Sequence, residues 1–302
     1  MRDPEIIALR ERLAARVHAP AIADRRRDFD LIALIYPTAR DIVVTPVDAG
    51  GVRAEWSVST DAAADRAVLY LHGGGYVIGS LASHRHLVAE IGRAAGARAL
   101  ALDYRLAPEH PFPAAVEDAL AGYRFLLAQG FAPERIALAG DSAGGGLVVA
   151  TLVAIRDAGL RQPGGGYCLS PWVDLEGIGA SMTTNAARDP IVQLEPLLEM
   201  SAHYLHGADP RSPLAAPLHA DLHGIAPLFI QVGAAETLLD DATRLAGAAG
   251  AADVAVSLEC WPEMIHVWPL FHPDLAAGRR AIAAGGAFLR RALAGGTAGG
   301  IA

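Results

Sequence analysis

The sequence contains no lysine, only two cysteines and no long uncharged run of apolar residues. Two cysteines far apart in the chain cannot build a disulfide framework or a cysteine metal site, so Cys168 and Cys260 are interpreted as buried small hydrophobic residues. No stretch approaches the uncharged length of a membrane span, and the N-terminus lacks the apolar core of a signal peptide. These absences predict a cytoplasmic protein without stable membrane association.

A surface suited to nucleic acid is also missing. All 25 positively charged residues other than histidine are arginine, and the formal net charge is −8. Arg25-Arg26-Arg27 is the one basic run, and because no aromatic residues accompany it we interpret it as a solvated helix face. The sequence therefore predicts no nucleic-acid partner.

The 302 residues are 52% apolar and 19% charged, which suits one large α/β domain with an insertion. Strand, loop and helix patterns alternate through 41–174 and 225–294, and this alternation predicts a mostly parallel central sheet flanked by helices. Residues 1–40 and 175–224 carry helical patterns without strands and are expected to form a helical cap. The Gly/Ala-rich residues 295–302 are expected to form a flexible tail.

The individual elements follow from hydrophobic periodicity and from glycine and proline breaks. Strands are predicted at 41–46, 52–58, 67–71, 98–102, 136–139, 166–170, 228–232 and 254–258, and helices at 84–95, 114–129, 194–205 and 276–293. Residues 5–36 show helical periodicity, with apolar positions on one face at Ile6, Leu9, Leu13 and Val17 and further along at Phe29, Leu31, Leu34 and Ile35.

A serine motif stands between a predicted strand and a predicted helix. Gly140-Asp141-Ser142-Ala143-Gly144 has the spacing G-x-S-x-G, in which small neighbours let a serine sit on a strained turn. The helix that follows directs its first N–H groups toward the atom that the serine attacks. We therefore expect Ser142 to be a nucleophile.

A serine nucleophile needs a base, and the base needs an acid that orients it. His266 follows the last predicted strand and is the expected base. Glu236 follows the strand at 228–232 directly and is favoured as the acid over Asp240 and Asp241, whose positions suit helix capping. The remaining histidines considered are interpreted as surface or packing residues: His84, His86, His110, His203, His206, His219, His223 and His272.

A glycine-rich segment follows the strand at 67–71. In His72-Gly73-Gly74-Gly75 the three glycines allow the backbone to curl so that N–H groups converge on an oxyanion. A phosphate cradle is the competing interpretation, but neither of the common phosphate-binding glycine motifs is present. The segment is therefore predicted to form an oxyanion hole.

Taken together, these motifs resemble those of the bacterial hormone-sensitive-lipase-like esterases, which have the α/β-hydrolase fold. The stretches that carry the resemblance span about 70–270 and are His72-Gly73-Gly74-Gly75-Tyr76, 103–109, 140–145, 170–175, Asp189-Pro190 and the His266 loop. The resemblance implies Ser142 as nucleophile, His266 as base and an oxyanion hole made by the N–H groups of Gly74, Gly75 and Ala143. The acid of the family is usually an aspartate, and in this chain Glu236 stands at the matching position.

The activity implied by the resemblance is hydrolysis of short-to-medium acyl esters through an acyl-enzyme, without a cofactor or metal. Many relatives pair through the last strand, so a homodimer through 254–258 is a further expectation. Two alternatives remain at this stage. One is a non-catalytic small-ligand-binding protein of the same fold, which the presence of His266 disfavours, and the other is a lactone, amide or carbamate hydrolase with the same triad.

Overall fold

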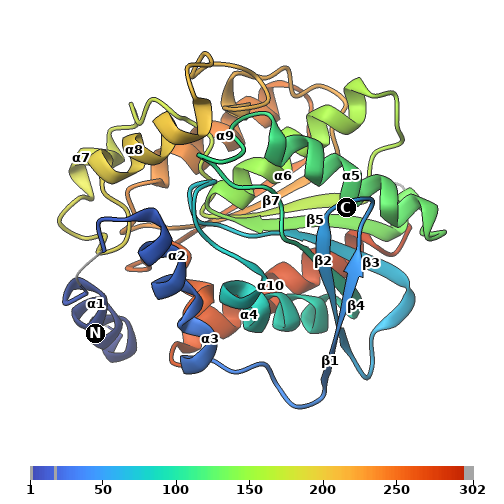
Figure 1. Ribbon diagram of the computed structural model, residues 1–302, viewed down its shortest axis with the longest axis horizontal. Coiled ribbons are helices and arrows are strands. Elements are labelled where there is room, and N and C mark those ends of the chain that lie inside the picture. Colours follow the sequence, from blue (N-terminus) through green and yellow to red (C-terminus); the bar gives the residue numbers. More distant parts are fainter. Residues whose placement is uncertain (1–2, 17–18, 296–302) are drawn as a thin grey trace.

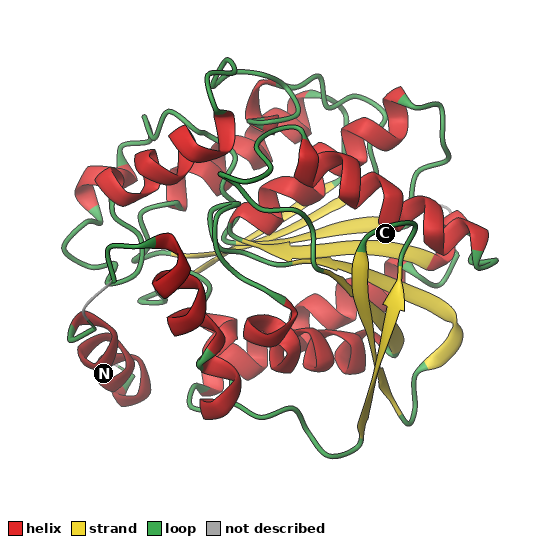
Figure 2. Ribbon diagram, viewed as in Figure 1, coloured by secondary structure: helices red, strands yellow, loops and turns green. Residues whose placement is uncertain are grey.

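The computed structural model describes residues 3–16 and 19–295, and its centre is an eight-stranded sheet with helices on both faces (Figures 1 and 2). The strands are β1 (Ile42–Asp48), β2 (Arg53–Ser59), β3 (Ala63–Leu71), β4 (Ala97–Leu102), β5 (Ile136–Asp141), β6 (Gly165–Leu169), β7 (Leu228–Gly233) and β8 (Val256–Trp261). Their order across the sheet is β1-β2-β4-β3-β5-β6-β7-β8. β1 and β2 pair antiparallel, β2 joins β4 antiparallel, and every later pair is parallel. The mostly parallel sheet predicted from the sequence is confirmed.

The helices form a layer on each face of the sheet (Figure 2). The longer ones are α1 (Pro4–Ala14), α2 (Ile22–Asp30), α4 (Leu81–Ala95), α5 (Ala114–Ala128), α6 (Ala143–Asp157), α8 (Leu194–Leu205), α9 (Leu239–Ala251) and α10 (Ala276–Ala292); α3 (Ile32–Ile35) and α7 (Ser181–Thr184) are single turns. α4 and α10 cover one face, and α5, α6 and α9 cover the other. None of the helices in the described ranges is both long and apolar enough to cross a bilayer.

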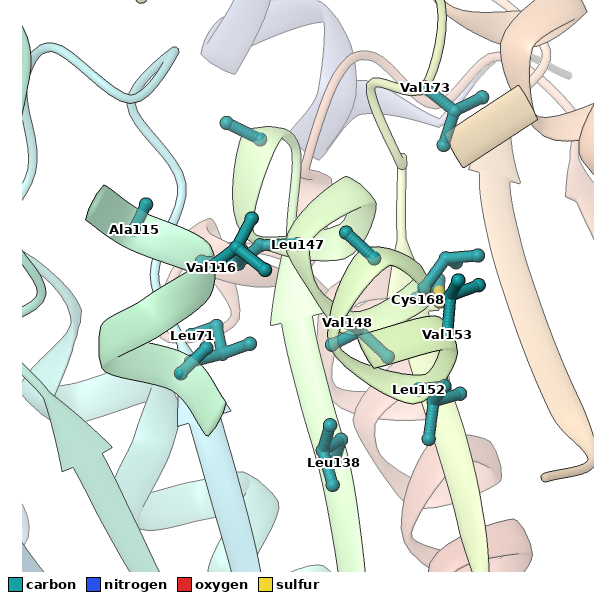
Figure 3. Close-up of a cluster of buried hydrophobic side chains, with 14 of the residues drawn as sticks. Leu71, Ala115, Val116, Leu138, Leu147, Val148, Leu152, Val153, Cys168 and Val173 are labelled. Carbon is teal, nitrogen blue, oxygen red and sulfur yellow. The ribbon is translucent and has the colours of Figure 1, made fainter. Parts of the chain in front are cut away.

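Two hydrophobic cores result from the alternation of side chains along the strands. In β5, Ile136 and Leu138 enter the core under α5 and α6, whereas Ala137 and Ala139 face α4 and α10. Figure 3 shows the first of these cores, in which Leu138 lies below the helical residues Leu147 and Val148. Every residue of β5 and β6 is buried, as expected for central parallel strands.

Sequence signals at the helix ends explain several boundaries. α4 begins with a capping box, in which Ser80 and Ser83 each satisfy a backbone N–H of the other, and it ends at Gly96, whose φ of 62° is left-handed. Asp3 caps α1 by accepting a hydrogen bond from the Glu5 N–H (3.0 Å). These helices therefore start and stop where the local chemistry directs.

The N-terminal periodicity was only partly predictive. Ile6, Leu9 and Leu13 are buried as expected, and Val17 lies outside the described residues. Beyond them, Leu31, Leu34 and Ile35 are exposed, and Ile32 and Tyr36 are buried instead. The apolar periodicity does not continue as one buried face because α2 ends at Asp30 and α3 starts a new helical phase at Ile32.

The segments expected to form a cap lie beside one another. Residues 1–40 contribute α1 to α3, and 175–224 contribute α7, α8 and a short 3₁₀ turn at Pro217–His219. Arg25 of α2 ion-pairs with Glu199 of α8 (3.3 Å), which joins the two segments. The division into cap and catalytic domains stays a prediction, and 296–302 of the predicted tail lie outside the described residues.

The carboxyl ends of the parallel strands meet at one edge of the sheet, where ligands bind in open α/β folds. The glycine-rich segment follows β3, Ser142 follows β5, and Ser170 follows β6. Glu236 follows β7, and the loop with His266 follows β8. The topology thus gathers the residues that the motifs single out.

Candidate active site

Ser142 occupies a strained turn between β5 and α6. Its φ of 53° and ψ of −122° are unusual for a residue with a side chain and cost on the order of 1–3 kcal/mol. The neighbouring glycines leave room for this turn. A Cβ on Gly140 would lie 2.4 Å from the Gly144 carbonyl oxygen, and a Cβ on Gly144 would lie 2.0 Å from the Leu71 carbonyl oxygen. The G-x-S-x-G spacing is therefore a packing requirement of this structure.

Glu236 and His266 form a buried pair. Glu236 Oε1 lies 3.0 Å from His266 Nδ1, and the two residues are 0% and 4% exposed. This contact fixes the Nδ1 proton toward the carboxylate and leaves Nε2 as the ring atom able to accept a proton. None of the hydrogen bonds among the described residues joins the Ser142 hydroxyl to this ring. Such bonds are often long in unliganded enzymes and shorten when substrate binds.

The carboxylate of Glu236 also affects the ionisation of His266. Burial alone would lower the pKa of His266, but the hydrogen bond and the negative charge of Glu236 outweigh burial and raise this pKa above its ordinary value of 6.5. The shift favours the folded state at acid pH, and this contribution to stability disappears as the pH rises through the folded-state pKa. His266 can therefore hold a proton that it has accepted in this site.

Two groups that the sequence analysis did not assign hold Glu236 in place. The Ser170 hydroxyl and the Gly233 N–H both donate to Glu236 Oε2, each at 2.7 Å. Ser170 Oγ also accepts a hydrogen bond from the Val267 N–H (3.1 Å), next to His266. Ser170 is the last residue of the strand predicted at 166–170 and the first residue of the stretch 170–175 that carries the family resemblance. Its position at the carboxyl edge of the sheet is the sequence signal that points to a functional residue there.

Replacing Ser170 with alanine tests this support. We expect kcat for an ester to fall by about tenfold, because losing one buried hydrogen bond to a charged group costs about 1–3 kcal/mol and part of that loss falls on the transition state. Ser201→Ala is the matched control, since this buried serine donates to the Leu175 carbonyl (2.9 Å) away from the acid. Steady-state kinetics at one pH compare the two variants, and equal losses of kcat would contradict the assignment.

The glycine-rich segment after β3 forms a left-handed turn. The φ angles of Gly74, Gly75 and Tyr76 are 116°, 63° and 61°. The Val77 and Ile78 N–H groups both donate to the Gly74 carbonyl oxygen (3.1 and 2.9 Å), which closes the turn. We call residues 72–79 the oxyanion turn, after the function that the sequence predicts for them. Ala143 is the first residue of α6, so its N–H is one of the helix donors without an intrahelical partner.

A buried network links the oxyanion turn to Asp141, the residue before Ser142. Asp141 Oδ1 accepts from the Tyr70 hydroxyl (2.7 Å) and from the Gly73 N–H (3.0 Å), and Asp141 Oδ2 lies 3.3 Å from His84 Nε2. The sequence predicts His84 to be a surface or packing residue and indicates no function for Tyr70. Their pairing with Asp141 joins elements far apart in the chain, so no local pattern indicates it.

The alternative acids point elsewhere. Asp240 Oδ2 accepts from the Ser181 N–H (3.0 Å), and Asp241 Oδ2 accepts from the Val173 and Asp174 N–H groups (both 2.9 Å). Burial raises the pKa of Asp241 to about 7. Neither side chain caps α9, whose N-cap has no side-chain hydrogen bond, so both aspartates instead anchor the chain after β6.

Two other sequence interpretations need correction. Cys168 is buried as expected, but Cys260 is exposed because it lies on β8, at the edge of the sheet. Arg26 is not a solvated side chain, since it is hydrogen-bonded to the oxyanion turn.

One group of side chains places possible metal-ligand atoms within 4.8 Å of one another: Asp174, Glu176 and His219. Both carboxylates already pair with arginines, Asp174 with Arg244 and Glu176 with Arg211. These residues do not fit a metal site.

Comparisons with known proteins show the family to which the chain belongs. A family model described as the α/β hydrolase fold matches residues 68–270. An acetyl-hydrolase of Streptomyces hygroscopicus is 49% identical over 299 residues, which cover 97% of this chain and 98% of the relative.

Solved structures are similar over nearly the whole chain. An esterase from the bacterial hormone-sensitive lipase family has 50% identity and a TM-score of 0.95, with 97% of this chain and 99% of that chain covered. EstE5 soaked by p-nitrophenyl butyrate has 46% identity and a TM-score of 0.94, with 97% and 100% covered. The chain thus belongs to the α/β-hydrolase family and, within it, to the bacterial hormone-sensitive-lipase-like esterases.

Proposed function

We propose that the chain is a serine carboxylesterase in which Ser142 is the nucleophile, His266 the base and Glu236 the acid. One observation carries the proposal: the buried Glu236–His266 pair lies at the same sheet edge as the strained serine turn. That combination suits acyl transfer, because a serine hydroxyl needs a neighbouring base and the base needs an orienting carboxylate.

In the proposed mechanism, Ser142 Oγ attacks the ester carbonyl carbon and its proton passes to His266 Nε2. The carbonyl π electrons move to the oxygen, which accepts hydrogen bonds from the N–H groups of Gly74, Gly75 and Ala143. Collapse of the tetrahedral intermediate breaks the bond to the alkoxide, and His266 returns the proton to it. Water then attacks the acyl-enzyme by the same steps, and Glu236 stabilises the imidazolium without being protonated.

Short-to-medium acyl esters are the proposed substrates. The 49% identical relative carries the name acetyl-hydrolase, and EstE5 was soaked with the butyryl ester of p-nitrophenol. Lactone, amide or carbamate hydrolysis would use the same residues, and a comparison of ester and amide turnover separates these activities. A non-catalytic binding protein is disfavoured because the base is present and paired with its acid.

A p-nitrophenyl ester series from acetyl to long acyl chains, together with a fluorophosphonate probe, tests the proposed function. We expect rapid hydrolysis of the acetyl and butyryl esters, slower hydrolysis of long esters, and stoichiometric labelling that blocks activity. A fluorophosphonate labels only a serine activated by its base, so a ligand-binding protein would not react. Absence of both labelling and ester turnover in folded protein would refute the proposal.

Two further expectations stay predictions. β8 forms one edge of the sheet, so a homodimer through this strand is proposed, because an unpaired edge permits strand addition. The cytoplasmic location expected from the sequence is the other.

A further inference from the structure

The three consecutive arginines of α2 form one basic run in the sequence, but in the structure each has different hydrogen-bond and ion-pair partners. Arg25 pairs with Glu199 on α8 and donates to the Ala19 carbonyl (2.9 Å). Arg27 pairs with Asp24, one turn earlier on its own helix, and its side chain is 73% exposed. Arg26 instead reaches from α2 to the oxyanion turn, as the placement of α2 beside the sheet edge allows (Figure 1).

The Arg26 guanidinium engages acceptors on two loops. Its Nε donates to the Val77 carbonyl (2.8 Å), and its Nη2 donates to the Ala107 carbonyl (2.9 Å). The same group pairs bidentately with Glu109, through Nη1 to Oε1 (2.9 Å) and Nη2 to Oε2 (2.7 Å). This planar fork fixes direction as well as charge, which a lysine ammonium cannot reproduce.

The carbonyl that Arg26 holds belongs to the oxyanion turn. Val77 contributes two groups to the turn. Its carbonyl accepts the hydrogen bond from Arg26, and its N–H donates the hydrogen bond to the Gly74 carbonyl that closes the turn. Ala107, whose carbonyl Arg26 also holds, donates its N–H to the Tyr76 carbonyl (2.9 Å). Arg26 therefore ties together the turn and the loop that supports it.

The backbone of this turn needs such support. Tyr76 has a φ of 61°, a conformation that is unfavourable for a residue with a side chain and persists only where the surroundings hold it. The ring of Tyr76 stacks on that of Tyr204 in α8 at a centroid separation of 3.8 Å. Arg26, from residues 1–40, and Tyr204, from residues 175–224, thus both contact the oxyanion turn directly after its glycines.

We propose that Arg26 is a positioning residue for the oxyanion hole, which keeps the N–H groups of Gly74 and Gly75 in place by tying Val77 and Ala107 to α2. The inference rests on the proposed function of these glycines. Arg26 acts through the turn and does not touch the substrate in this account. The N-terminal segment that carries Arg26 therefore affects the rate of the chemical step through the position of this turn.

The arginine run provides matched variants for the test: Arg26→Ala, Arg26→Lys, Arg25→Ala and Arg27→Ala. For Arg26→Ala we expect kcat with p-nitrophenyl butyrate to fall by about tenfold to a hundredfold with little change in KM, because a misplaced oxyanion donor weakens only the transition state. Arg27→Ala is expected to keep the wild-type kcat. Arg26→Lys is expected to lose activity nearly as much as Arg26→Ala, since lysine keeps only the charge.

An inhibitor that forms an oxyanion gives the readout that distinguishes positioning from a general structural effect. Ser142 Oγ adds to the carbonyl carbon of a trifluoromethyl ketone, its proton passes to His266, and the carbonyl oxygen becomes an oxyanion. The inhibition constant of Arg26→Ala should rise by the same factor as its kcat falls. Arg25→Ala, which loosens the contact between α2 and α8, should keep the wild-type inhibition constant.

The outcomes separate this inference from the proposed function. Wild-type kcat and inhibition constant in Arg26→Ala, with Ser142→Ala inactive, would overturn the inference and leave the esterase mechanism intact. Equal losses in Arg26→Ala and Arg27→Ala would also overturn it, because charge alone would then explain the effect. If Arg26→Ala does not fold, Arg26→Lys decides: an unchanged kcat rejects the positioning of the turn, and a parallel loss of kcat and inhibitor affinity supports it.

Discussion

Replacing Ser142 with alanine is expected to lower kcat for p-nitrophenyl butyrate by about a millionfold, because removing the nucleophile removes the covalent step that the whole triad serves. The variant should fold normally or slightly more easily, since alanine keeps the small volume at this turn. Its substrate dissociation constant should change little, because the substitution removes one hydroxyl and leaves the other side chains of the site unchanged.

Thermal unfolding and ligand titration provide the controls for Ser142→Ala. A variant that unfolds at the wild-type temperature and has lost turnover supports a chemical function for the hydroxyl. Full activity of folded Ser142→Ala on the acetyl or butyryl ester would exclude Ser142 as the nucleophile.

Replacing Glu236 with glutamine is expected to lower kcat by about ten-thousandfold, because the amide no longer stabilises the imidazolium or fixes the tautomer of His266. Wild-type kcat/KM should fall as the pH drops through a value above 6.5, since His266 must be unprotonated to act and Glu236 raises its pKa. In the variant this inflection should move to lower pH, because burial then dominates the pKa of the imidazole.

Asp240→Asn is the matched control for Glu236→Gln. Asp240 carries the same charge nearby in sequence but accepts its hydrogen bond from the Ser181 N–H, so its variant should keep activity and the wild-type pH profile. If only Asp240→Asn were crippled, the choice of Glu236 as the acid would be wrong.

The sequence was sufficient for features whose cause is local. Glycine and proline breaks and the alternation of apolar residues located the strands, and the amphipathic α8 was predicted with its observed bounds, Leu194–Leu205. β8 begins two residues later than predicted, at Val256, because an edge strand is half exposed and its apolar pattern is weak. The order of motifs along the chain placed Glu236 and His266 after consecutive strands.

Contacts that depend on three-dimensional packing were not predictable. Ser170 contacts Glu236 because β6 and β7 are neighbours in the sheet. The sequence places both residues at strand ends, but it does not show that these two strands are adjacent. Arg26 and Arg27 are identical in type and adjacent, yet only the rotation of α2 decides that Arg26 faces the oxyanion turn. Local patterns therefore predict the reacting groups, and the fold shows which groups contact them.

Mass spectrometry of the enzyme quenched with acid during turnover of p-nitrophenyl butyrate tests the central claim most directly. The account predicts a butyryl group on the peptide that contains Ser142, attached at its hydroxyl, and no such adduct in Ser142→Ala. Burst-phase release of p-nitrophenol should accompany the adduct. A butyryl group on a different residue, with Ser142 unmodified in enzyme that turns over the ester, would contradict the account.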